Sequence, residues 1–469
     1  MKIPFSINPL IMEVYERSQE VQDLISEQNI LIDAQDLDFD DDEIPSLANL
    51  CVRKIAFYFD EHPWFYEVPC SDRDYLLELL SLDLDLELTV PLIKSEYYWE
   101  RRYQKHFGEV IHPTPKIWTW KSLYLEREVQ RLVETASPSM LGERKIEPEL
   151  KLCAPYVKQL LVAQLQMWRP PFGTAPDDEP EIWPIDHIDF TYVLPHLPLV
   201  EQIDLVYGMN DVDFDFQWNM FRVSVRDCLQ LGKAILALPA LTLLRIRKSN
   251  IGDKQCKALM QSLVENVTIV ELNMCNCCIG DEGAACIAKF LEVSPVLKVL
   301  NLSNNVIRVK GTEALAFALM QPTCAPLASL TLSLNPLRRE GAVAIMRALV
   351  RCPLPEELYM SAVEFEGDVI ERLAQMMTVN NSLRILDVSS NYFGDQGAKT
   401  IIEALERNSM IEWLDMRETG ISEERQADIT KLLRRNQGLP LDAADDAKDD
   451  LKIEGSDDGK TMDEDEDDI

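Results

Sequence analysis

Three cysteines close together, Cys275, Cys277 and Cys278, are the residues whose types could most readily bind a metal. Cysteine thiolates are common ligands of a tetrahedral zinc ion. The repeat described below puts Cys275 at a position that faces solvent and Cys277 at a position that faces inward. One zinc ion could not easily take both sulfurs, so we expect these cysteines to be structural.

Two runs of alternating aspartates, at residues 36–40 and 211–215, have the spacing of the first ligands of an EF-hand calcium loop. Such a loop has glycine at its sixth position and a bidentate glutamate at its twelfth. The residues at these positions are Asp41 and Leu47 in the first run, and Phe216 and Arg222 in the second. Neither run is therefore expected to bind calcium, and the first is interpreted as an acidic linker.

Catalytic motifs are missing from the sequence. The five histidines, His62, His106, His112, His187 and His196, have no ligand spacing with another histidine or a cysteine. There is no GxxxxGK[ST] phosphate loop, no GxGxxG turn and no HExxH helix. We expect no enzymatic activity, no cofactor and no metal.

The net charge of −34 is unevenly distributed along the chain. Residues 1–199 hold 36 acids and 18 bases, residues 200–439 hold 30 and 25, and residues 440–469 hold 14 and 3. Binding to nucleic acid needs positive charge that neutralises phosphates. The charge therefore argues against nucleic acid, against an anionic membrane surface and against direct docking of the whole chain on acidic microtubules.

The 11 cysteines lack the spacing of a disulfide framework, and no convincing secretory segment is present. Both observations indicate a reducing compartment. The longest strongly apolar run, AILALPALTLL, is too short to span a bilayer and is broken by Pro239. We expect a soluble, cytoplasmic protein.

The elements that position these residues come from a repeat. Leu297, Leu300, Leu302 and Asn305 follow the pattern LxxLxLxxN. Stronger and weaker copies of this pattern begin at Val200, Leu241, Ile269, Leu297, Leu327, Pro355, Leu383 and Ile411. Successive starts are 41, 28, 28, 30, 28, 28 and 28 residues apart, and such a period is the mark of a leucine-rich-repeat solenoid.

Each repeat combines a short strand with a helix. Positions four to seven alternate apolar and polar residues, as a strand with one buried face does, and apolar residues at three- and four-residue spacing follow. Position nine turns the chain inward, where the side chain of Asn305 can satisfy backbone groups left over by the turn. Ser249, Cys277 and Thr419 are smaller substitutes, whereas Val363 cannot serve. Glycines fourteen residues after a start open the returning segment, at Gly283, Gly311, Gly341 and Gly397.

We therefore predict an α/β fold: a ribonuclease-inhibitor-like solenoid of about eight repeats, preceded by a mainly helical N-terminal region. The expected domains are an N-terminal acidic segment at 1–45, the helical region at 46–168, a proline-rich linker at 169–194, the repeats at 195–437 and a disordered acidic tail at 438–469. Because the tail has almost no apolar residues to bury, we expect it to be dispensable for folding.

Within the helical region, helices are expected at residues 46–59 with Ser46 as cap, at 71–80 with Ser71 or Asp72 as cap, and at 122–136. Another is expected at 155–168, starting at Pro155. Strict alternation of leucine and acid at 80–88 favours a strand. Residues 97–107 combine aromatic and basic side chains that could contact nucleic acid, but an amphipathic helix packed on its own domain is the favoured interpretation.

The first repeat is specific enough to name a family. Its distinctive residues are Tyr207, Gly208, Trp218, Phe221, Asp227, Cys228 and Leu229. Together with the phrases LCVRKIA, RDYLLELLSLDLDLEL and YYWERR, this repeat resembles subunit five of the nexin–dynein regulatory complex, also called t-complex-associated testis-expressed protein one. The resemblance covers roughly residues 46–437.

This resemblance implies a non-catalytic structural subunit in the axoneme of motile cilia and flagella, held by other subunits of the regulatory complex. That complex joins neighbouring doublet microtubules and influences dynein activity. The main alternative is a Ran-type GTPase-activating protein, which also joins this longer repeat to an acidic tail. The long N-terminal region and the low repeat count argue against it. A ubiquitin-ligase adaptor is a weaker alternative.

Solvent-facing strand positions five and seven predict a protein-binding concave face. The candidate residues are Arg245, Arg247, Lys248, Asn273, Asn301, Thr331, Tyr359, Asp387, Asp415 and Arg417. This row runs from basic at the first full repeat to mixed and acidic at the last. The alternative is a merely solvated face.

Overall fold

The computed structural model describes residues 46–108, 119–138, 140–168, 186–209, 221–365 and 368–439. The expected segment at 1–45 and residues 440–469 of the expected tail lie outside the described residues, as do residues 169–185 of the proline-rich stretch. The chain divides into two compact units, Met1–Ser81 and Leu82–Ile469.

The first unit contains two described helices, α3 (Leu47–Phe57) and α4 (Cys70–Leu79). The Ser46 hydroxyl accepts a hydrogen bond from the Asn49 backbone N–H at 3.2 Å, which confirms the expected cap. The expected caps of α4 are wrong. Ser71 and Asp72 lie inside that helix, because the Asp72 N–H already donates to the Pro69 carbonyl at 2.9 Å.

The second unit begins with α5 (Leu86–Leu92), α6 (Glu96–Phe107), α7 (Trp120–Thr135) and α8 (Met140–Cys153). The strand expected at 80–88 is wrong, since residues from Leu86 onward are helical. The alternating leucines have no neighbouring strand among the described residues, and a lone strand would leave its backbone groups unpaired. In the helix, by contrast, the Thr89 N–H donates to the Asp85 carbonyl.

The aromatic stripe of α6 is part of the core. Tyr98, Trp99 and Tyr103 are fully buried. Arg102 is buried with them, and its guanidinium donates to the Leu84 carbonyl at 2.7 Å. This burial confirms the packed amphipathic helix, and it removes most of the aromatic surface that could stack on nucleic-acid bases.

The helix expected at residues 155–168 is wrong. After α8 the chain forms a strand, β1 (Gln159–Val162), which pairs in parallel with β2 (Gln202–Leu205). The Glu126 carboxylate of α7 accepts the N–H groups of Lys158 and Gln159 and so fixes the start of β1. The sheet therefore begins before the proline-rich stretch, and its nine described strands exceed the eight predicted repeats by one.

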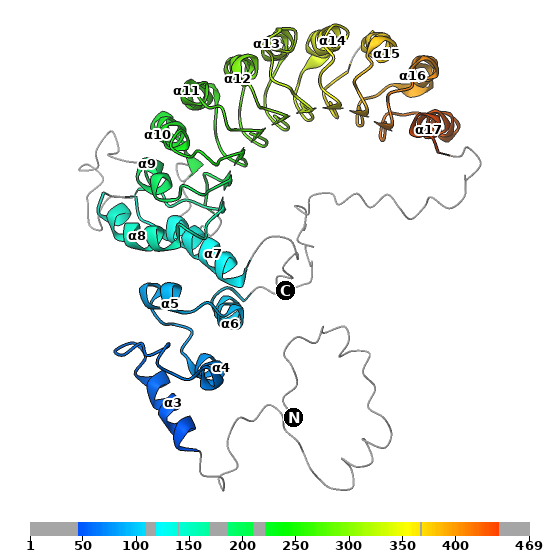
Figure 1. The fold of residues 1–469 in the computed structure, drawn as a ribbon. Helices are drawn as coiled ribbons and strands as arrows, with labels where there is room; N and C mark the ends of the chain where they lie inside the picture. Colours follow the sequence, from blue (N-terminus) through cyan, green and yellow to red (C-terminus); the bar gives the residue numbers. More distant parts are fainter. Residues whose placement is uncertain are drawn as a thin grey trace, which may run out of the picture. The chain divides into compact units, whose positions relative to one another are not determined.

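The repeats form a parallel sheet in the order β1 to β9, with helices along its outer side (Figure 1). A short helix, α9 (Phe190–Val193), and a 3-10 turn, η2 (Leu194–His196), precede β2. The further strands are β3 (Leu243–Ile246), β4 (Glu271–Asn273), β5 (Val299–Asn301), β6 (Ser329–Thr331), β7 (Glu357–Tyr359), β8 (Ile385–Asp387) and β9 (Trp413–Asp415).

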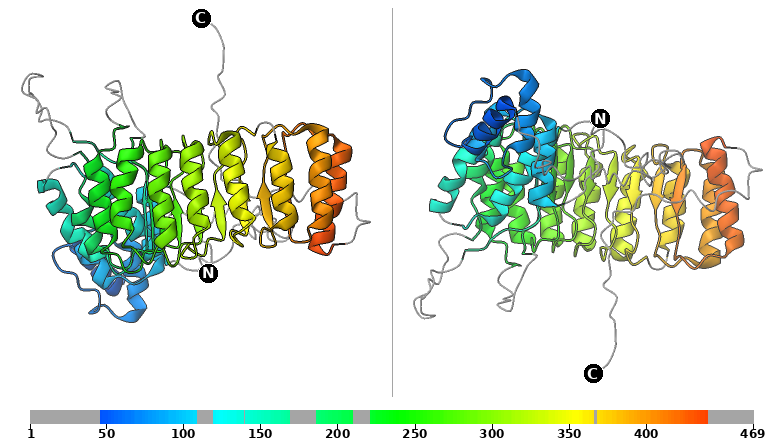
Figure 2. Two further views of the ribbon diagram at one scale, coloured as in Figure 1. Left: turned by 90° about the horizontal axis from the view of Figure 1, so that it is seen from above. Right: turned by 90° about the horizontal axis from the view of Figure 1, so that it is seen from below.

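The helices that follow β2 to β9 stand in one row, as Figure 2 shows from above. They are α10 (Val225–Ile235), α11 (Asp253–Leu263), α12 (Asp281–Val293), α13 (Val309–Leu319), α14 (Arg338–Leu349), α15 (Val369–Val379), α16 (Gly394–Arg407) and α17 (Glu423–Gln437). Strand position four is a leucine in every repeat from β3 to β9, and these leucines are partners across the sheet and buried. The core is the layer between this leucine row and the helices.

The predicted role of position nine is confirmed. Asn335 donates from Nδ2 to the carbonyls of Leu302, Leu332 and Ser333, and its Oδ1 accepts the Ile307 N–H. Asn305 and Asn391 make the same set of contacts in their repeats. The smaller substitutes Ser249, Cys277 and Thr419 also bind backbone groups, whereas Val363 is simply buried.

The repeat glycines permit close approach of neighbouring helices rather than opening the returning segment. Gly311 is the third residue of α13. A Cβ atom there would lie 2.9 Å from Cβ of Ala284 in α12 and 2.9 Å from Oδ1 of Asp281. The Asp281 carboxylate also accepts the Gly311 N–H at 2.9 Å, so that α12 caps the start of α13.

Candidate protein-binding face

Strand position five forms one continuous row across the inner side of the sheet. Its residues are Asp204, Arg245, Asn273, Asn301, Thr331, Tyr359, Asp387 and Asp415, and each is the Cα partner of the next. The structure thus brings most of the predicted candidates together. Helices cover only the opposite side of the sheet (Figure 1), so this concave face is the side of the repeats available to a partner.

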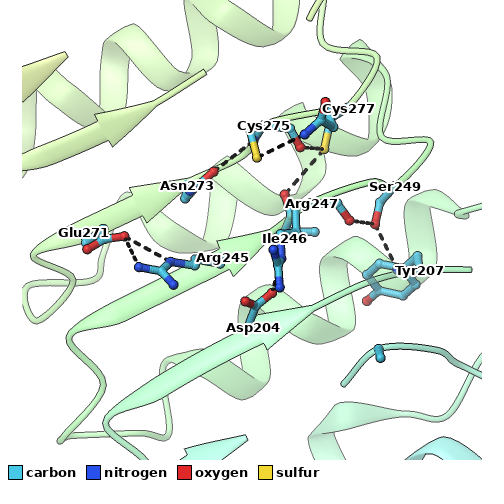
Figure 3. A network of polar contacts seen from close by, with 12 residues as sticks. Asp204, Tyr207, Arg245, Ile246, Arg247, Ser249, Glu271, Asn273, Cys275 and Cys277 are labelled. Carbon is cyan, nitrogen blue, oxygen red and sulfur yellow. Dashed lines mark hydrogen bonds and ion pairs between the residues drawn. The ribbon is translucent and has the colours of Figure 1, made fainter. Parts of the chain in front are cut away.

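The first part of the face, on β2 to β4, carries paired charges (Figure 3). Arg247 donates from Nε to Oδ1 of Asp204 at 2.9 Å, and Arg245 donates from Nη2 to Oε1 of Glu271 at 2.9 Å. The expected basic end of the row is therefore wrong. Asp204 lies one strand before the first full repeat and Glu271 at position three, and both neutralise arginines that the sequence reasoning counted alone.

Lys248, the third basic candidate, lies at position eight rather than on the strand. Its backbone is left-handed, with φ of 52°, and its side chain is exposed. Position eight is left-handed in all seven repeats from β3 to β9. Lys248 therefore projects from the loop edge of the sheet.

The polar side chains of the face are held by their own backbone. Asn273 and Asn301 accept, through Oδ1, the N–H two residues further on, at 3.1 and 2.9 Å. Asp387 and Asp415 accept the equivalent N–H at 2.9 and 3.0 Å. These contacts fix the side chains before any partner arrives, which lowers the entropy cost of binding.

The last part of the face, on β7 to β9, is acidic and aromatic. Tyr359 lies between Glu357 of its own strand and Asp387 of the next. Burial, aided by these two carboxylates, raises the pKa of the Tyr359 phenol to about 12. Asp415 is buried and is bound by the exposed guanidinium of Arg417, with Nη2 to Oδ2 at 2.6 Å.

The cysteines of the first full repeats serve the fold. Cys277 fills position nine and donates from Sγ to the Ile246 carbonyl at 3.4 Å (Figure 3). Burial raises the pKa of this thiol to about 12, so it stays protonated rather than acting as a thiolate ligand. In the described part of the chain, no group of three or more His, Cys, Asp or Glu side chains could hold a metal ion.

A buried polar cluster that the sequence reasoning missed joins His187 to α10. His187 Nδ1 lies 3.0 Å from Oδ2 of Asp227, and the Ser224 hydroxyl donates to the same oxygen at 2.9 Å. The residue types are those of a hydrolase triad. However, serine and histidine both bind the carboxylate instead of each other, and His187 is 1% exposed. The cluster is an anchor for the chain that enters the repeats.

Comparison with known families agrees with this geometry. The family described as Leucine Rich repeat matches residues 265–288, 293–316 and 379–401. The chain is a leucine-rich-repeat protein. Ribonuclease inhibitor of Sus scrofa is 26% identical to it over 274 residues, which is 52% of this chain and 58% of the relative. The predicted ribonuclease-inhibitor-like solenoid is confirmed.

The resemblance stated from the sequence is also confirmed. This leucine-rich-repeat protein is 31% identical over 258 residues to Dynein regulatory complex subunit 5 of Mus musculus, which covers 52% of this chain and 51% of the relative. The protein of the same name in Chlamydomonas reinhardtii is 28% identical over 215 residues, covering 46% of this chain and 50% of the relative. The match spans about half the length of these curated relatives.

Among solved structures, Leiomodin-1 Actin-Binding Site 2 covers 39% of this chain at 21% identity and a TM-score of 0.25, a value too low to support an argument. None of the helices in the described part of the chain is long and apolar enough to cross a membrane.

Proposed function

We propose that this chain is a non-catalytic subunit of the dynein regulatory complex in the axoneme of cilia and flagella. There it would act as a protein-binding scaffold that helps to link doublet microtubules and regulate dynein. Relatives named Dynein regulatory complex subunit 5 in mouse, human and an alga support this proposal. The observation that carries the scaffold role is the in-register row of backbone-fixed polar side chains on the concave face.

The proposed binding residues are the ten candidates named from the sequence, now joined by Asp204 and Glu271. Paired charges on β2 to β4 favour a partner segment of mixed charge there. The acidic and aromatic end on β7 to β9 favours a basic one. In a scaffold of this kind, side chains held in place by the fold give specificity without any reaction.

The proposed route to the axoneme is indirect. The net charge of −34 gives the chain little electrostatic reason to bind an acidic microtubule lattice. Neighbouring subunits of the complex would hold it instead. The Ran-type GTPase-activating alternative predicts stimulated nucleotide hydrolysis, which a GTPase assay with the purified chain would reveal.

Two sedimentation measurements test this proposal. The purified full chain should stay in the supernatant with bare microtubules at physiological salt. It should sediment with axonemes from which the endogenous protein has been depleted. Tight binding to bare microtubules would refute the indirect route, and absence from both pellets would refute the scaffold role itself.

The concave face is tested by neutralising its acidic end in the same assay. Asp387→Asn with Glu357→Gln should weaken sedimentation with axonemes. Glu403→Gln with Glu406→Gln, in α16 on the outer side, removes the same charge and should have no effect. Equal retention of both double variants would show that the concave face is merely solvated.

A further inference from the structure

One side of α3 carries a stripe of exposed apolar side chains. Leu47, Leu50 and Phe57 have exposed fractions of 78%, 46% and 77%. Spacings of three, four and three residues place them, with Lys54, in one line along the helix. Clustered exposure of large apolar side chains marks an interaction site more often than chance.

The other side of the same helix is already used. Val52 is 4% exposed and packs into the small core of the first unit, next to Phe59, which is fully buried. Arg53 donates from Nε to the Tyr75 hydroxyl of α4 at 3.0 Å. α3 is thus apolar on two sides, and its fold accounts for only one of them.

Lys54 gives the stripe a positive charge. Its ammonium lies 4.4 Å from the centroid of the Tyr58 ring and, among the described residues, has no carboxylate partner. No acidic residue occurs within α3. A lysine in an otherwise apolar helix seam fixes the register of the partner, because a wrong register leaves its charge unpaired.

We propose that the stripe formed by Leu47, Leu50, Lys54 and Phe57 docks one amphipathic helix of another protein, with a carboxylate placed opposite Lys54. This inference rests on the proposed function, since a subunit of a large assembly has neighbouring proteins as partners. The seam would be about 16 Å long, the length of an eleven-residue helix. It is a second docking surface, separate from the concave face of the repeats.

Charge decides between this occupant and two others. A second copy of the chain would bring only cations, Arg53 and Lys54, to the seam. An anionic membrane would meet a unit in which residues 46–81 hold six acids and three bases. An acidic amphipathic helix satisfies both the apolar line and the lysine.

Site-specific crosslinking tests which molecule occupies the stripe. A photo-crosslinking residue replaces Leu50 in the full chain, expressed in ciliated cells that lack the endogenous protein, and crosslinked axonemal peptides are sequenced. We expect one peptide from another axonemal protein, with an apolar heptad seam and a carboxylate. Crosslinks to a second copy, to residues 1–45 of the same chain, or to nothing would overturn the proposal. Replacement of Phe317, exposed on α13, is the positional control.

Variants test whether the stripe matters for assembly. Leu50→Ser with Phe57→Ser should lower retention in salt-washed axonemes by about tenfold, as expected for the loss of two large apolar contacts. Lys54→Glu should also lower it, and Lys54→Arg should not. Phe317→Ser is the control, and circular dichroism should be unchanged for all four.

The outcomes separate this inference from the proposed function. Absence of the wild-type chain from axonemes contradicts the proposed function. Presence of the wild-type chain, with equal retention of the Leu50 and Phe57 double variant, contradicts only the docking stripe.

Discussion

Arg247 on β3 donates from Nε to Oδ1 of Asp204 on β2, 2.9 Å away, and so joins two neighbouring strands on the concave face. The two side chains differ in environment, since the Asp204 side chain is 10% exposed and that of Arg247 is 39% exposed. Removing the arginine charge therefore leaves a largely buried carboxylate without its partner. Charge reversal here cannot test binding alone, because it also affects the fold.

A charge swap separates the two effects. Arg247→Glu should lower the free energy of unfolding by about 1 kcal/mol, a modest value because the arginine is solvated. Asp204→Arg combined with Arg247→Glu should recover most of this loss in urea unfolding. If the double variant is as unstable as the single one, the ion pair does not support the sheet. Any binding defect of the recovered double variant then reports on recognition.

Asn335 should be among the most costly polar residues to replace. It is 1% exposed, and its amide binds carbonyls of two successive repeats. Asn335→Ala leaves those buried carbonyls and the Ile307 N–H unsatisfied, so we expect a loss of about 2–4 kcal/mol in urea unfolding. Asn301→Ala, at a half-buried position with one backbone contact, should cost less than about 1 kcal/mol. Similar losses for both would contradict the asparagine row.

The repeat geometry was predictable because it depends on local chemistry that recurs. Asn305 and Asn391 carry the same signal and make the same contacts. A second row of asparagines was missed. Asn380 and Asn408 lie at the turns from helix to strand, where each Oδ1 accepts two N–H groups of its own turn and each Nδ2 donates to a carbonyl of the preceding repeat. Their 28-residue spacing could have revealed them.

Leu334 is strained at position eight. Its φ is 59°, a left-handed backbone that costs a non-glycine residue about 1 kcal/mol, and its side chain is 54% exposed. Asparagine fills the same position at Asn276 and Asn304. Leu334→Asn should therefore raise the free energy of unfolding by several tenths to about 1 kcal/mol. Leu334→Val should lower it, and calorimetric melting of both variants checks the signs.

Strand β1 could not be predicted from the repeat. QLLV at residues 159–162 lacks the spacing of LxxLxLxxN, and the surrounding sequence also fits a helix. Its pairing depends on contacts distant in sequence: Leu160 partners Ile203, and Glu126 holds the first residues of the strand. The partners of Arg245 and Arg247 were missed for a similar reason, because they lie on other strands.

Asp227 should make stability depend on pH. Burial alone would raise its pKa, but hydrogen bonds from His187 and Ser224 outweigh burial and hold the pKa below the ordinary 3.8. Between these two values the unfolded chain binds the extra proton, so this stabilisation is present above about pH 4 and lost as pH falls below it. Asp227→Asn should be less stable near neutral pH, with a shallower loss below about pH 4.

Urea unfolding across that range measures the effect. Asp428→Asn, on the partly exposed surface of α17, is the matched control and should keep the wild-type slope. A slope for Asp227→Asn equal to that of the wild type would mean that the cluster does not titrate as the geometry implies.

The central claim is that this leucine-rich-repeat protein is an axonemal subunit held by protein contacts. The most direct test is the location of the tagged full chain in a ciliated cell, before and after detergent and salt extraction of the cilia. The proposal predicts signal along the axoneme that persists through extraction. A diffuse signal, or one at the nuclear envelope, would contradict it and favour the GTPase-activating alternative.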